Sequence, residues 1–150
     1  MKNLFDPSLV VEVRERLERL QPDSPRLWGK MTAPQAVAHC SAGFEWALGD
    51  TRPPRMFVGR IIGGFVKRMA HGNDDPFRRN SPTAPGLVVA DQRELATERT
   101  RLRGLIDRFR SAGPAGCTTN PHSFFGRLTP EEWAILMYKH VDHHLRQFGV

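Results

Sequence analysis

The sequence contains no long hydrophobic run, and this absence bears on where the protein acts. No apolar stretch approaches the ~20 residues that a helix needs to cross a bilayer. The first twenty residues, MKNLFDPSLVVEVRERLERL, carry charges where a signal peptide has its apolar centre. We therefore expect a cytoplasmic protein with no membrane partner.

Cysteine is scarce, and the residues present form no recognisable site. Cys40 and Cys117 are the 2 cysteines of the 150-residue chain, which excludes a disulfide framework, and neither has a CxxC or zinc-ribbon spacing. We expect both to be reduced thiols. Cys40 follows a histidine, but adjacent helical residues diverge by about 100°, so His39 is poorly placed to act as its base. A small buried hydrophobe is the expected role of Cys40.

Alternation of polar and apolar residues with period two is also missing, which predicts an all-α chain. Four segments have helical periodicity instead. Their predicted bounds are Asp6 to the sequence QPDSP, Thr32 to Gly49, Asp91 to Ala112, and Thr129 to near the C-terminus. The start of the last is the clearest, because Thr129 and Glu132 have the spacing of a capping box. Burying four one-sided apolar stripes together predicts a four-helix bundle, formed by residues 1–150 as a single domain.

A long segment rich in proline and glycine, from Asp50 to Val89, separates the second and third helices. A connection of this length is typical of a crossover or a functional flap, and it has room for a short helix around Met56 to Met69. Its arginines could bind an anionic substrate through bidentate contacts, or they could be solvated loop charges. The arginines considered for this role are Arg52, Arg55, Arg60, Arg78 and Arg79.

The formal net charge of +6 raises the question of a nucleic-acid partner. The basic residues are scattered, however, and in EVRERLERL and QRELATERTRLRGLIDRFR they alternate with acids at helical spacings. That pattern is typical of solvated helix faces. The basic clusters also lack interleaved aromatics, which argues against nucleic-acid binding.

The last predicted helix contains three histidines in a stretch of five residues, within the sequence YKHVDHHLRQFGV. His140 and His144 are four residues apart, so their side chains emerge one turn from each other and can reach a common atom. They continue an apolar stripe that begins at Trp133 and includes Met137. Asp142 lies nearly opposite this face, and His143 lies on its flank, where it could at most support a ligand.

A tight metal site needs a third donor from another element, and His39 is the best candidate. It lies in the middle of the second predicted helix, among small residues that would let another helix or a ligand come close. Three neutral histidines with open positions form the pattern of a catalytic metal centre, with Zn–N distances of about 2.0 to 2.1 Å. Zinc and nickel are the first candidates, although imidazole also suits copper and iron.

A structural role for these histidines is the alternative. Buried histidines often serve as hydrogen-bonded core residues, and a pair near a helix C-terminus can simply interact with the helix dipole. His71 and His122 fall in predicted loops, where we expect solvent-exposed or turn-stabilising roles. Either histidine could instead approach the site as part of a lid.

The stretch HVDHHLRQ resembles the H-x-x-H-H-x-x-Q ending of the DinB/YfiT-like superfamily of metal-dependent proteins. The order of the elements is similar too, and the resemblance to one uncharacterised branch extends over nearly all 150 residues. It implies an up-down-down-up four-helix bundle, a metal held by His39, His140 and His144, and a possible homodimer. The superfamily includes thiol S-transferases that use bacillithiol, mycothiol or glutathione, and a maleylpyruvate isomerase.

The resemblance and the residues together suggest metal-assisted transfer of a thiol to a small-molecule substrate, or hydrolysis. A bound divalent ion would lower the pKa of a thiol or water. Glu45 and Asp142 project away from the histidines, so no carboxylate is placed as a general base. Gln35 and Gln147 remain as neutral hydrogen-bonding groups. A thiol ionised by the metal needs no strong base, which favours S-transfer.

Two further questions stay open at this stage. Trp46, Trp133 and Met137 could form an apolar wall of the site, or they could be core residues. The whole chain could also be a non-catalytic binding or stress-related module, with a structural metal or none.

Overall fold

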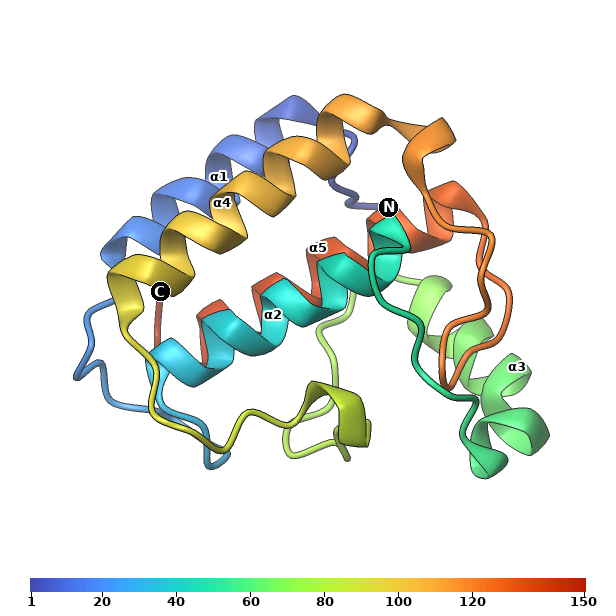
Figure 1. The fold of residues 1–150 in the computed structure, drawn as a ribbon, viewed down its shortest axis with the longest axis horizontal. Helices are drawn as coiled ribbons and strands as arrows, with labels where there is room; N and C mark the ends of the chain where they lie inside the picture. The colour runs from blue at the N-terminus through green and yellow to red at the C-terminus, as the bar shows by residue number, and fades with distance from the viewer.

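The computed structural model describes residues 1–150 and is all-α, with five α-helices and no strand (Figure 1). The α-helices are α1 (Pro7–Arg19), α2 (Ala33–Leu48), α3 (Phe57–His71), α4 (Leu95–Ala112) and α5 (Pro130–Gln147). Two short 3-10 helices, η1 (Pro85–Leu87) and η2 (Pro114–Gly116), lie in the connections. The prediction of an all-α chain is confirmed.

The predicted helix starts are set by side chains that cap the first free backbone N–H groups. Asp6 accepts a hydrogen bond from the Ser8 amide at the start of α1. Thr129 and Glu132 form the predicted capping box of α5. α4 begins four residues later than the predicted Asp91, because the carboxylate of Glu94 accepts from the amides of residues 96 and 97 and takes the N-cap position.

The helix predicted around Met56 to Met69 in the long middle segment is present as α3. α3 has 15 residues and lies at one corner of the molecule (Figure 1). Its inner side carries Gly59 and Gly63, and a Cβ at these positions would lie 2.5 Å and 2.2 Å from the carbonyl oxygen of Phe124. The absence of side chains at both glycines therefore lets α3 pack directly on the backbone of the Phe124 loop.

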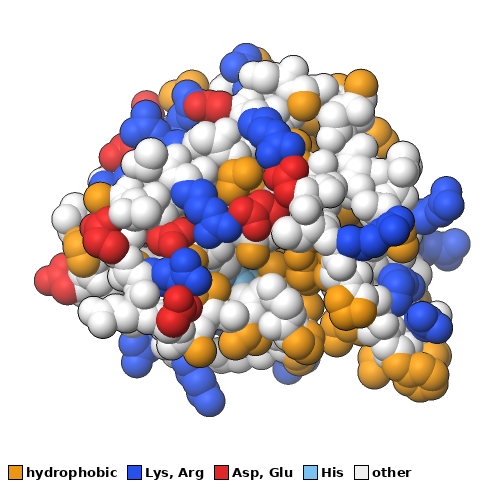
Figure 2. All heavy atoms as spheres, viewed as in Figure 1, with side chains coloured by type: hydrophobic (Ala, Val, Ile, Leu, Met, Phe, Trp, Pro, Cys, Tyr) orange, Lys and Arg blue, Asp and Glu red, His pale blue; other side chains and the backbone are white.

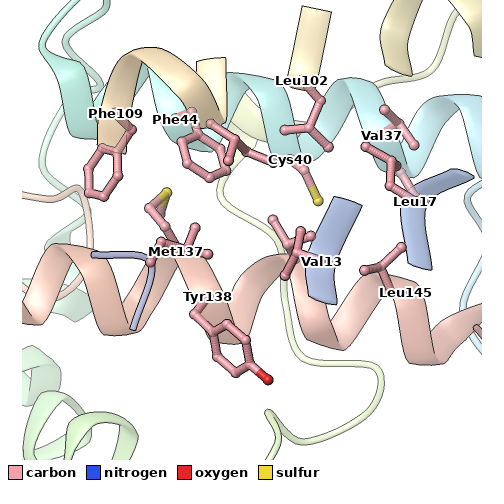
Figure 3. Packing of buried hydrophobic residues seen from close by; sticks show 14 of the residues in the cluster. Val13, Leu17, Val37, Cys40, Phe44, Leu102, Phe109, Met137, Tyr138 and Leu145 are labelled. Carbon is pink, nitrogen blue, oxygen red and sulfur yellow. The ribbon is translucent and has the colours of Figure 1, made fainter. Parts of the chain in front are cut away.

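The hydrophobic core lies between α1, α2, α4 and α5. α2 contacts both α4 and α5, and Figure 3 shows Cys40 and Phe44 of α2 close to Leu102 of α4 and Met137 of α5. Cys40 is 2% exposed, and burial raises the pKa of its thiol, as expected for a small core residue rather than a nucleophile. None of the helices is both long enough and apolar enough to span a bilayer.

Residues 72–93, here called the covering segment, return from α3 to α4 and include η1. Side chains of the helices hold this segment by its backbone: Gln35 donates to the carbonyl of Asp91 at 3.1 Å, and Lys139 donates to that of Asn73 at 3.1 Å. The guanidinium of Arg79 lies 4.3 Å from the ring centre of Trp28. The covering segment thus closes over the part of α2 and α5 that carries the histidines.

Candidate metal centre

Three imidazoles from α2 and α5 meet in the interior. The Nε2 atoms of His39 and His140 are 2.7 Å apart. The ring centre of His144 lies 4.7 Å from that of His39 and 5.2 Å from that of His140. One nitrogen from each ring lies within 4.8 Å of the other two. The predicted convergence of one histidine on α2 with a pair on α5 is confirmed.

A glycine on α2 allows the two helices to approach so closely. Gly43 lies one turn after His39, and a Cβ there would be 3.0 Å from Nδ1 and 3.1 Å from Cε1 of His140. The end of the Met137 side chain would lie 3.9 Å from the same point. The small residues beside His39 therefore make room for His140, as the sequence predicted.

Hydrogen bonds orient two of the three rings. His39 Nδ1 lies 2.7 Å from the carbonyl oxygen of Leu87 in η1, an acceptor that requires the proton on Nδ1. His144 Nδ1 lies 2.8 Å from Oε1 of Gln147, and the Gln147 amide nitrogen donates to the Trp28 carbonyl at 2.8 Å. That second bond fixes the amide with its oxygen toward His144. Both rings thus carry a proton on Nδ1, so that in the neutral form Nε2 is unprotonated, the arrangement that metal-ligating histidines adopt.

Burial keeps the cluster uncharged. His39 is 4% and His144 is 8% exposed, whereas His140 is partly exposed. Burial lowers the pKa of His39 and, together with the neighbouring imidazoles, lowers that of His140 well below its usual value. The pKa of His144 is lowered to about 3 by the same causes. Because only neutral imidazole can bind a cation, protons do not compete for these nitrogens at neutral pH.

The donor set fits a divalent ion. Neighbouring nitrogens around a tetrahedral Zn²⁺ are about 3.3 Å apart when the Zn–N distances are about 2.05 Å. The observed separations, from 2.7 Å to less than 4.8 Å, bracket that value. Because His39 Nε2 has no proton, His140 donates its Nε2–H to it. The proton of His140 thus lies between the two nitrogens, where a cation would bind. The cluster could therefore hold a metal ion after small side-chain rotations.

The other residues predicted near the site have varied positions. Gln147 contacts His144 directly, and the ring of His143 lies 5.1 Å from that of His144 and packs beside Trp28. Trp46 and Trp133 flank His122 rather than the three histidines, with ring centres 5.8 Å and 5.5 Å from it. Met137 is buried near Gly43.

Gln35 makes no hydrogen bond to the three imidazoles. Its side-chain oxygen accepts from the Thr32 amide in the capping box of α2, and its nitrogen binds the covering segment at Asp91. Both ends of this side chain are therefore engaged elsewhere, the oxygen in capping α2 and the nitrogen at Asp91.

No carboxylate lies among the histidines. Glu45 pairs with Arg101 at 2.5 Å on the surface between α2 and α4, and Asp142 pairs with Arg16 of α1 at 2.7 Å. Both acids point away from the cluster, as the helical geometry predicted. The site therefore offers imidazoles and amide groups but no acidic general base.

Two backbone carbonyls contribute to the site, and sequence reasoning did not find them. The carbonyls of Leu87 and Trp28 orient His39 directly and His144 through Gln147. Gly29 adjoins the second contact: it has φ +77°, and a Cβ there would lie 2.5 Å from the Gln147 amide nitrogen. Backbone groups carry no residue signature, and only this glycine could have indicated a close approach.

Gln147→Leu is expected to weaken divalent-metal affinity about 10- to 100-fold, because His144 Nδ1–H would lose its acceptor. Gln147→Glu is the matched control, since its carboxylate keeps an acceptor at Nδ1. Isothermal titration of metal-free protein with Zn²⁺ measures both affinities. Equal affinities for the wild type and Gln147→Leu would show that the amide does not orient the ligand.

His122 forms a second, separate histidine environment. Its Nδ1 accepts hydrogen bonds from the amides of Phe124 and Phe125 at 3.1 Å and 3.2 Å, and its ring packs between aromatic rings. Burial, with the positive charge of Arg55 and with His71 nearby, lowers the pKa of His122 to about 4. Its expected turn-stabilising role is therefore supported by the amide bonds, which need an unprotonated Nδ1.

Acidification is expected to destabilise the metal-free protein partly through His122. The pKa of this residue is lower in the folded than in the unfolded state, so its contribution is fully present above about pH 6.5 and is lost as pH falls toward 4. Between pH 7 and pH 5 the loss is about 1 to 2 kcal/mol. In His122→Asn, Oδ1 can still accept from the turn amides but does not titrate. Urea unfolding at both pH values should show a smaller pH dependence in this variant; an unchanged dependence would contradict the assignment.

The fold and the site define an all-α protein with a buried three-histidine cluster that could bind a metal ion. The chain belongs to the family described as "Protein of unknown function (DUF1569)", whose model matches residues 6–149. No curated protein and no solved structure matches the chain.

Proposed function

We propose that this protein binds one divalent metal ion, zinc or nickel, through His39, His140 and His144, and uses it to transfer a low-molecular-weight thiol to an electrophilic small molecule. The single observation that carries the proposal is the convergence of three neutral imidazoles, two of them with Nδ1 held by an oxygen acceptor. Three protein ligands leave positions open for a reactant, which distinguishes catalytic from closed structural sites.

The chemistry of the surrounding residues favours a thiol over a water nucleophile. When bound, the ion would lower the pKa of a thiol and so supply a thiolate at neutral pH. Glu45 and Asp142 are both committed to ion pairs elsewhere, so no carboxylate is available to activate a water. A bound thiol would lose its proton to solvent, and its sulfur would bond to the electrophilic carbon as the leaving group departs from that carbon with the bonding electron pair. Hydrolysis would lack a carboxylate to take a proton from the attacking water, which favours the thiol.

The fold is consistent with the DinB-like up-down-down-up bundle that the sequence resembles. In support, α1, α2, α4 and α5 surround one core, and the connection between α2 and α4 is long and irregular apart from α3 and η1. A homodimer is part of the same proposal and rests on the resemblance alone.

The alternative is a non-catalytic binding or stress-related module with a structural metal or none. The observation that favours it is the cover over the site: His39 and His144 are buried, and the Leu87 carbonyl of the covering segment binds His39 directly. A substrate larger than a few atoms would have to displace part of this segment.

Turnover assays on protein purified without a histidine tag test the proposal. Elemental analysis should find close to one Zn or Ni per chain. A chromogenic electrophile should then be consumed with glutathione, bacillithiol or mycothiol. The activity should disappear on treatment with EDTA and return when the metal is restored. Bound metal without turnover with any of these thiols would support the alternative with a structural metal. Protein that binds no metal would overturn the proposed thiol transfer and support the alternative without a metal.

A further inference from the structure

α3 exposes an apolar face, which contains none of the three histidines. Six large hydrophobic side chains of this helix are between 44% and 75% exposed. They are Phe57, Val58, Ile61, Ile62, Phe65 and Met69, here called the α3 apolar face. At about 100° per residue they fall within an arc of about 140° on one side of the helix. Apolar surface gathered in this way marks an interaction site more often than scattered exposed residues do.

The opposite side of α3 holds the helix on the protein. Besides the two glycines on the Phe124 backbone, His71 Nε2 lies 3.1 Å from the Glu132 carbonyl, and Lys67 pairs with the Glu132 carboxylate at 3.0 Å. The helix is therefore fixed by contacts of its inner side, which leaves its apolar face on the outside of the molecule. Figure 2 shows hydrophobic side chains and Lys or Arg side chains gathered at the corner that α3 occupies in Figure 1.

Unpaired positive charge lies within and beside this face: at about 100° per residue, Arg68 falls inside the arc and Arg60 about 60° outside it. No Asp or Glu occurs between Thr51 and Asn73. Arg60 and Arg68, both exposed, have no carboxylate within 4.0 Å, and Arg52 and Arg55 donate to amide or carbonyl oxygens. On the α1 and α4 side, by contrast, most arginines are in ion pairs, as Arg14 is with Asp107 and Arg108 with Asp50.

The positive charge near the α3 apolar face and the protrusion of the helix indicate which kind of partner it binds. A second copy of the chain would bring the same unpaired arginines against each other, whereas an anionic surface would complement them. The apolar face is the outer side of a single protruding helix, so a planar surface can accept it without a groove. We propose that α3 is an interfacial anchor that inserts its apolar face into the headgroup region of a bilayer containing anionic phospholipids. Such contact is peripheral, and it differs from the spanning segments on which the expectation of no membrane partner was based.

Vesicle co-sedimentation of the full chain tests the anchor. The protein should sediment with vesicles of phosphatidylcholine mixed with phosphatidylglycerol, much less with phosphatidylcholine alone, and less as salt is raised. The double variant Ile61→Ser/Phe65→Ser should bind at least about tenfold more weakly, because two large apolar side chains leave the lipid. The matched control Val11→Ser/Leu27→Ser removes residues that are 52% and 63% exposed elsewhere, and it should bind like the wild type.

A charge-matched pair of variants tests the basic border. Arg60→Gln/Arg68→Gln should weaken binding to the mixed vesicles about tenfold or more. Arg19→Gln/Arg110→Gln removes the same net charge from exposed positions on α1 and α4 and should have little effect. All substituted residues are exposed, and circular dichroism would verify that the helices are retained.

Three results would overturn the anchor. The first is the absence of binding to anionic vesicles, and the second is an equal loss of binding in the control variants. The third is self-association in analytical ultracentrifugation that Ile61→Ser/Phe65→Ser abolishes, without vesicle binding, which would assign the face to contacts between copies of the chain. Metal analysis of the same variants keeps this question separate from the proposed thiol transfer, because none of them touches the three histidines.

Discussion

Replacing His140 with alanine is expected to reduce the bound metal from close to one ion per chain to almost none. His140 is the central member of the cluster: its Nε2 is 2.7 Å from that of His39, and its ring is one turn from His144. Two imidazoles on different helices remain in the variant, which is too few for a tight site in water. Elemental analysis after dialysis measures the content directly.

The same substitution should remove the stabilisation that metal gives to the folded chain. A ligand that binds only the folded state adds about 4 kcal/mol at a concentration 1,000 times its Kd. We therefore expect the unfolding temperature of the wild type to rise on addition of Zn²⁺ and to fall with EDTA, whereas that of His140→Ala should respond to neither.

His143→Ala is the matched control for His140→Ala. His143 is the adjacent histidine on α5, packs against Trp28 and Phe77, and does not belong to the cluster of three. This variant should keep its metal. Equal metal loss in both variants would show that the ion binds elsewhere, and retention in His140→Ala would contradict the assignment of the ligands.

Asp142→Ala is expected to lower the free energy of unfolding by about 3 kcal/mol, a large share of the about 5 to 15 kcal/mol typical of a domain. Asp142 is 5% exposed and accepts from Arg16 at 2.7 Å and from Arg146 at 2.8 Å. Its removal leaves the buried guanidinium of Arg16 with only Glu12 and a backbone carbonyl as partners. Loss of one member of a buried pair costs more than the pair itself contributes, because the remaining charge stays desolvated.

Asp107→Ala is the control for a surface pair. Asp107 pairs with Arg14, but their side chains are 52% and 35% exposed, so water screens the interaction. We expect a change below about 1 kcal/mol. Urea unfolding of the metal-free proteins at pH 7 compares the two variants. Similar costs for both would mean that Asp142 is not the main partner of Arg16.

The sequence alone determined where the helices lie and where α1, α2 and α5 begin. Capping residues and apolar periodicity are local, so Asp6, Thr32 and Thr129 could be assigned from their neighbours in the chain. The pairing of His140 with His144 was equally local, because residues four apart on a helix always share a face. The start of α4 was predicted four residues too early, because Glu94, which is not among the preferred N-cap residues, takes the N-cap position.

The tertiary structure decided what no local pattern contains. Whether His39 meets His140 depends on how α2 packs on α5, and the choice of ring nitrogen depends on carbonyls of Leu87 and Trp28 that arrive from distant loops. The exposure of the α3 apolar face was also unforeseeable, because an amphipathic helix normally buries its apolar side and here two glycines on the other side make the contact. Local sequence fixes backbone conformation and side-chain spacing, whereas partners across the fold are set by the packing of the whole chain.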